Sequence, residues 1–171
     1  MKIITDDAVY VMKNDLKQLF IANSNEMFRK VFNNIILVID DSNRYEFEKF
    51  DGQREMDFFK GIDWMVDYDD VKDLSKEELD QMCQDIADKR CQITHEFRLM
   101  PEDERKKNAQ AIELQCTLLD FKMISLRDIL WFKMGRLNIT LPDGVDYPKD
   151  YRKEENGTQQ LTKKRWPKKQ E

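Results

Sequence analysis

The sequence predicts a mainly α-helical fold: an antiparallel two-helix hairpin as the core, two N-terminal helices packed on it, at most a small β element, and a disordered C-terminal tail. Gly and Pro are scarce, at five and four residues among 171, whereas sandwiches and barrels need many turns. Two long stretches repeat apolar residues in alternating steps of four and three, the spacing of packed helices. Ten Phe, nine Met and three Trp need burial, so we expect a folded core.

The first element expected is a helix that begins at Thr5. Asp6 and Asp7 would then lie at the positive end of the helix dipole. An apolar face follows at helical spacing, made of Val9, Met12, Leu16, Leu19 and Phe20.

A second helix is expected from Asn23, which forms a capping-box pattern with Glu26, to Ile39. Its apolar end, Ile35 to Ile39, also fits a short strand, because periodicity cannot assign so short a run. From Asp40 to Asp73 the pattern loosens, and short helices or a small strand both fit.

The clearest prediction is the hairpin. Ser75 and Glu78 form a capping-box pattern, and apolar residues then recur to Met100. Pro101 ends this helix, and a second helix with the same repeat runs to Gly135. A connection this short makes the two helices antiparallel neighbours.

One polar residue interrupts the repeat of the first hairpin helix. Arg90 falls at a position that the repeat would bury, where a charge needs a partner or a route to water. It could pair with an acidic residue on the facing helix, or this face could meet another subunit. We favour the intramolecular pairing, and we expect a monomer or a helix-mediated homodimer.

After Gly135 the chain places Leu137, Ile139 and Leu141 on one side of an extended segment. This segment would either pair as a strand with the region of Tyr45 to Phe50 or lie as an apolar strap across the helices. We expect one domain over residues 1–148 and a flexible basic tail over residues 149–171, which is polar and lacks periodicity.

The chain shows neither a signal-peptide core nor an apolar run long enough to cross a bilayer. Its three cysteines, Cys83, Cys91 and Cys116, are odd in number and make no disulfide framework. We therefore expect a soluble, cytoplasmic protein with no membrane association.

Common catalytic and cofactor motifs do not occur, so we predict no enzyme, no cofactor and no metal. The five glycines are scattered and cannot form a phosphate-binding loop. A single histidine, His95, rules out sites built on His pairs. Cys91 lies four residues before it on one helix face, but a helical cysteine beside an apolar seam is usually a small core residue.

The acidic stretch Asp63 to Asp73 also matches a calcium loop in part. Asp67, Asp69, Asp73 and Glu78 fall at positions one, three, seven and twelve of an EF-hand. The match fails at position six, where the loop needs Gly and the sequence has Lys72. A solvated acidic approach to the capped helix explains the stretch more simply.

Charge is distributed unevenly along the chain. Between Asp40 and Asp88 there are 17 acidic residues against six basic ones, although the whole chain carries only −5. We predict a non-enzymatic protein-binding module, a regulator or inhibitor that docks an acidic face on a basic, nucleic-acid-handling partner. The candidate docking residues are Asp63, Trp64, Asp67, Tyr68, Asp69, Asp70 and Asp73.

The alternative is a nucleic-acid-associated protein that binds through its basic tail. Lysines and arginine there would contact phosphates and Trp166 would stack on a base. The candidate contacts are Lys163, Lys164, Arg165, Trp166, Lys168 and Lys169. A tail that serves only solubility, beside a plain solvated acidic surface, accounts for the same composition.

Overall fold

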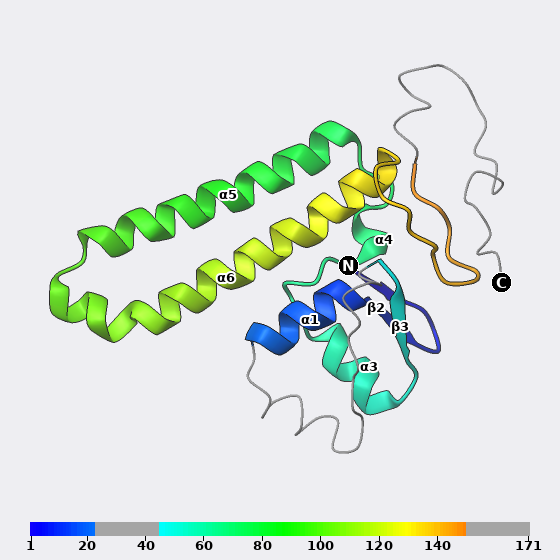
Figure 1. Cartoon of the computed structure of the whole chain (residues 1–171), viewed down its shortest axis with the longest axis horizontal. Coiled ribbons are helices and arrows are strands. Elements are labelled where there is room, and N and C mark those ends of the chain that lie inside the picture. Colours follow the sequence, from blue (N-terminus) through cyan, green and yellow to red (C-terminus); the bar gives the residue numbers. More distant parts are fainter. Residues whose placement is uncertain (23–44, 150–171) are drawn as a thin grey trace.

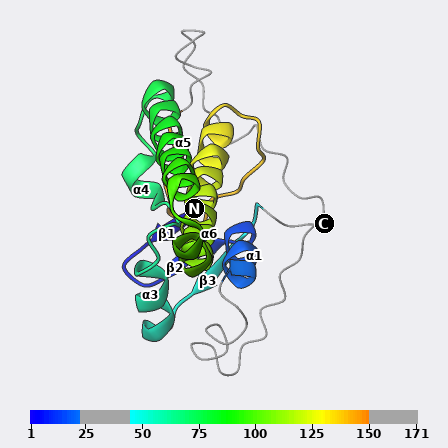
Figure 2. The same ribbon diagram turned by 90° about the vertical axis from the view of Figure 1, so that its left-hand side faces the viewer.

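The computed structural model describes residues 1–22 and 45–149. In chain order the elements are β1 (Lys2–Ile4), β2 (Val9–Met12), α1 (Lys13–Ala22), β3 (Phe47–Phe50), α3 (Gln53–Lys60), α4 (Tyr68–Val71), α5 (Lys76–Leu99) and α6 (Glu102–Lys133). The long α5 and α6 pack against each other as an antiparallel hairpin, and the sheet, α1 and α3 lie below it in both views (Figures 1 and 2). The predicted mainly α fold with a small β element is confirmed.

The expected helix start at Thr5 is wrong. Residues 2–12 form a β-hairpin in which Lys2 pairs with Val11 and Ile4 with Val9. Thr5 closes its turn: the hydroxyl donates to the Asp7 carboxylate at 2.8 Å and accepts from the Ala8 N–H at 3.1 Å. Thr and Asp favour such turns for the same reason that they cap helices, because their short side chains bond nearby backbone groups.

Helix α1 starts eight residues later than predicted, at Lys13, and places Leu16 and Leu19 in the core. β3 pairs antiparallel with β2 and completes a sheet in the order β1-β2-β3. The second expected helix, Asn23 to Ile39, lies outside the described residues.

The hairpin begins and ends where the sequence predicts. The Ser75 hydroxyl accepts from the Glu78 N–H at 3.2 Å, and the Glu78 carboxylate accepts from the Ser75 N–H at 2.7 Å, which completes the capping box. Arg90 pairs with Asp120 on the facing helix at 2.7 Å. This contact within one molecule is the pairing that we expected for Arg90.

The segment after α6 lies as an apolar strap. Gly135, with φ +68°, turns the chain at the end of α6, and Leu137, Ile139 and Leu141 are then buried against the helices without forming a strand. The predicted tail lies outside the described residues from residue 150 onward.

Burial along the hairpin is uneven. One core cluster joins β1, α4, the strap and the ends of α5 and α6 nearest the sheet, and a second joins β2, α1 and α3 with Trp64 and Met65. Leu79 is the only fully buried residue of α5, and buried residues of α6 begin at Ser125. The other half of the hairpin projects away from both cores (Figure 1).

Candidate functional site

The acidic stretch Asp63 to Asp73 runs from the end of α3 to the start of α5 and contains α4. Asp67 caps α4, because its carboxylate accepts from the Asp69 N–H at 3.3 Å. Asp63, Asp69, Asp70 and Asp73 are exposed, and Asp67 is half-buried. The structure therefore brings the five predicted aspartates to one short surface segment.

A buried lysine lies beneath one end of this stretch. The Lys2 Nζ donates to three carbonyl oxygens at the end of α3, at 3.0, 3.0 and 3.1 Å, those of Phe59, Lys60 and Ile62. Burial lowers the pKa of Lys2, and the nearby negative charges of Asp67, Asp63 and Asp70 oppose that shift. Part of the acidic clustering thus has a structural cause, since these carboxylates stabilise a buried ammonium.

A second buried lysine holds the other end. Lys133, 2% exposed at the end of α6, donates from Nζ to the carbonyl oxygens of Lys72, at 2.9 Å, and Leu74. These carbonyls follow α4, so the ammonium satisfies backbone groups that a helix end leaves unpaired. Lys2 and Lys133 together hold the backbone segment that carries the acidic side chains.

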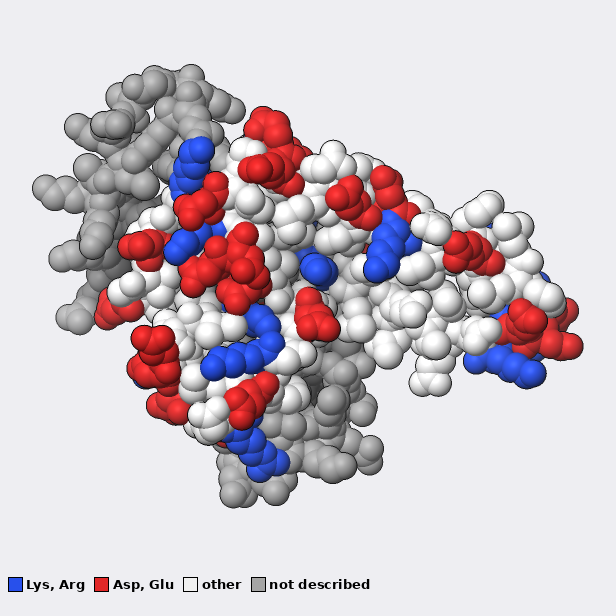
Figure 3. Space-filling view, turned by 180° about the vertical axis from the view of Figure 1, so that it is seen from behind, with Lys and Arg blue, Asp and Glu red and all other residues white. Residues whose placement is uncertain are grey.

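Few cations balance the exposed carboxylates. Within the described ranges, Lys72 makes the one ion pair to the five aspartates, to Asp69 at 2.8 Å. Glu77 and Asp80 of α5 are also exposed and follow directly in the chain. Figure 3 shows Asp and Glu gathered over α4 and the adjoining part of α5, with fewer Lys and Arg between them. We call Asp63, Asp67, Asp69, Asp70, Asp73, Glu77 and Asp80 the acidic face.

The two predicted aromatic contacts belong to the core instead. Trp64 is 8% exposed and packs on Phe121 with ring centroids 5.3 Å apart. Tyr68 is fully buried, its hydroxyl donates to the Asp146 carbonyl at 2.9 Å, and burial raises its pKa far above the usual value. The acidic face therefore presents carboxylates without these two aromatic side chains.

The partial calcium loop is not assembled as a metal site. Asp67 and Glu78 are engaged as helix caps, and in residues 1–22 and 45–149 no three His, Cys, Asp or Glu side chains are placed to hold a metal ion together. Cys91 and His95 are exposed on α5, and no hydrogen bond joins them.

A buried polar cluster ties β1 to α1 and α6. The Met1 amino group contacts the Asp15 carboxylate, and both groups are buried. Burial lowers the pKa of this amino group to about 4, an effect that the charge of Asp128 opposes. Ser125 and Asp128 are also fully buried on α6. The cluster is enclosed by the core and offers no access to a substrate.

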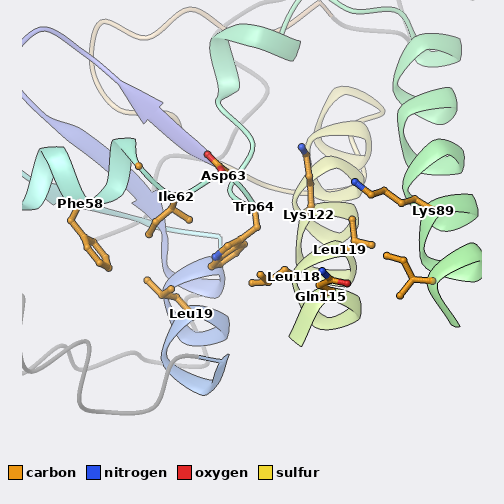
Figure 4. Close-up of a pocket in the computed structure, with 12 residues that line it drawn as sticks. Leu19, Phe58, Ile62, Asp63, Trp64, Lys89, Gln115, Leu118, Leu119 and Lys122 are labelled. Carbon is orange, nitrogen blue, oxygen red and sulfur yellow. The ribbon is translucent and has the colours of Figure 1, made fainter. Parts of the chain in front are cut away.

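An open groove separates the hairpin from the smaller helices. Its volume is about 500 Å³. Figure 4 shows one wall formed by α5 and α6, and the other wall formed by Leu19, Phe58, Ile62, Asp63 and Trp64. The second wall carries Lys89, Ile93, Gln115, Leu118, Leu119 and Lys122. No ion pair is formed by Lys89 or Lys122 with any residue in the described part of the chain.

Sequence reasoning missed the two buried lysines and the groove. Lys133 follows Leu126 and Leu130 at the next step of the α6 repeat, so its burial could have been anticipated. Lys2 carries no comparable signal. The basic residues of the alternative nucleic-acid site, Lys163 to Lys169, lie outside the described residues.

Comparison of the chain with protein-family models, with curated proteins and with solved structures finds no match. None of the helices in the described ranges is long and apolar enough to span a bilayer.

Proposed function

We propose that this protein is a non-enzymatic binding module that docks its acidic face on a basic surface of another protein. The proposal rests on a set of exposed carboxylates on a fixed backbone, where the five aspartates form a single ion pair with the described residues, that of Asp69 with Lys72. Unpaired surface carboxylates accept charge-assisted hydrogen bonds from Lys and Arg and speed association with basic partners.

The buried lysines make this face suited to binding. Lys2 and Lys133 hold both ends of the stretch through backbone carbonyls, so the carboxylates do not depend on a partner for their placement. A preformed face loses less conformational entropy on docking than a flexible acidic loop does. Surfaces rich in Lys and Arg occur on proteins that bind nucleic acids. The function proposed is therefore the regulation or inhibition of such a protein.

The test is affinity capture from extract of the native cells after nuclease treatment. The variant D69N/D70N/D73N removes three exposed negative charges, and the control variant D6N/D51N/D143N removes three exposed charges elsewhere. We expect the wild-type and control chains to retain the same protein and the first variant to lose it.

The captured protein is then titrated against all three chains at several salt concentrations. Wild-type affinity should fall with salt, and the face variant should bind more weakly and with a flatter salt dependence. Equal affinities for the wild type and the face variant would exclude this face as the docking surface. Capture that disappears with nuclease would favour the nucleic-acid alternative.

A further inference from the structure

The groove between the hairpin and the smaller helices has a mainly apolar lining, with two lysines on the hairpin wall and Asp63 on the opposite wall. Leu118 and Trp64 contribute apolar surface from opposite sides, and Lys89 and Lys122 both lie on the hairpin side (Figure 4). The two ammonium groups make no ion pair with any described carboxylate. An occupant of matching chemistry carries an apolar side chain next to carboxylates.

The turn of the hairpin has this chemistry. Leu99, at the end of α5, is 72% exposed, the highest value among the large apolar side chains of the described residues. Glu102, Asp103 and Glu104 follow it in the first turn of α6 and are exposed. Glu102 pairs with Lys106 at 2.7 Å, whereas Asp103 and Glu104 make no ion pair within the described ranges. We call these four residues the hairpin tip.

The tip cannot reach the groove of its own molecule, because both belong to the same straight hairpin. Leu99 lies ten positions after Lys89 on α5, which is about 15 Å of helix at 1.5 Å per residue. Leu114, 45% exposed on α6, lies one residue before the groove residue Gln115 on the way to the tip.

We propose that a second copy of this chain occupies the groove, with the two hairpins antiparallel and the tip of each molecule in the groove of the other. Leu99 meets the apolar lining, and Asp103 and Glu104 meet Lys89 and Lys122 of the other copy. A two-fold axis makes both contacts equivalent and closes the assembly as a dimer. The projecting half of the hairpin, which has no fully buried residue beyond Leu79 in α5, gains a partner.

The D69N/D70N/D73N substitutions leave the proposed dimer contacts unchanged, because Asp63 is the one residue of the acidic face that lines the groove. The protein-binding function and the dimer can therefore fail separately. The two are compatible, since a dimer would carry two acidic faces.

Two charge-reversed variants of the full chain test the pairing by sedimentation equilibrium. The groove variant is K89E/K122E and the tip variant is E102K/D103K/E104K. Wild-type chains should sediment at twice 20.6 kDa. Each variant alone should be a monomer, because like charges then face each other in both contacts and weaken association by about a hundredfold or more. An equimolar mixture should restore the dimer, since both contacts of the mixed pair join opposite charges.

Two further variants serve as controls. K49E/K76E reverses two lysines outside the groove and the tip and should remain a dimer. Leu99→Gln changes a largely exposed side chain, so it leaves the fold intact and should still weaken the dimer about tenfold. Circular dichroism checks that every variant keeps its helix content.

Each other result overturns the proposal. A monomeric wild type would show that a second copy of this chain does not fill the groove. Dimers of both reversed variants would place the interface on another surface. Monomeric variants that fail to associate when mixed, or an unchanged affinity in Leu99→Gln, would show that the tip and the groove do not meet.

Discussion

Replacing Lys133 with Met should destabilise the protein through the backbone that carries the acidic face. The ammonium of Lys133 is 2% exposed and donates to the carbonyls of Lys72 and Leu74. Met keeps most of the apolar stem but leaves two partly buried acceptors without this donor, at about 1 to 3 kcal/mol each. Part of that loss is offset because a charge no longer has to be buried, so we expect a net loss of about 2 to 4 kcal/mol.

Urea unfolding followed by circular dichroism measures this difference in the free energy of unfolding. Lys107→Met, at an exposed position of the same helix, is the matched control and should change stability by less than about 0.5 kcal/mol. If Lys133→Met lies within that control range, the two hydrogen bonds do not hold the turn after α4, and the structural account of the acidic face fails.

The Tyr68 hydrogen bond and the capping box of Ser75 and Glu78 can also be tested by substitution. Tyr68→Phe removes the donor to the Asp146 carbonyl and should lower the free energy of unfolding, measured in urea, by about 1 to 2 kcal/mol. An unchanged urea midpoint would show that the strap does not depend on this hydrogen bond. Hydrogen bonds from Ser75, above all from its backbone N–H, lower the pKa of Glu78 from its usual 4.5. The capping box should therefore stabilise the fold above pH 4.5. This stabilisation should be lost as the pH falls through the lowered pKa. The difference in unfolding free energy between wild type and Glu78→Gln should therefore shrink on acidification, and a constant difference from pH 7 to pH 3 would contradict the role of this carboxylate.

The hairpin could be predicted because its signals are local. Ser75 and Glu78 start α5, Pro101 separates the helices and Gly135 ends α6, each through its own backbone chemistry. The steps of four and three between apolar residues give the packed face. None of these features requires knowledge of a distant contact.

The N-terminus could not be predicted in the same way. Thr5, Asp6 and Asp7 suit a turn as well as a helix start, and Val9 and Val11 become strand residues because β3 pairs beside them. The choice is made by a partner strand 38 residues further along the chain. A local pattern cannot contain that information.

The candidate site shows the same limit. The clustering of five aspartates is visible in the sequence, but the burial of Trp64 and Tyr68 depends on packing against α6 and the strap. The ammonium of Lys2 beneath the stretch comes from a strand about 60 residues earlier. The sequence therefore indicates where negative charge gathers, and the fold determines which neighbours reach the surface.

Hydrogen exchange of the backbone amides, measured with and without the protein captured by the wild-type chain, shows directly which segment of this protein the partner covers. If the acidic face docks the partner, binding should slow exchange mainly over residues 67–80, which include α4 and the first turns of α5. Protection confined to other described segments, with residues 67–80 unchanged, would contradict the account.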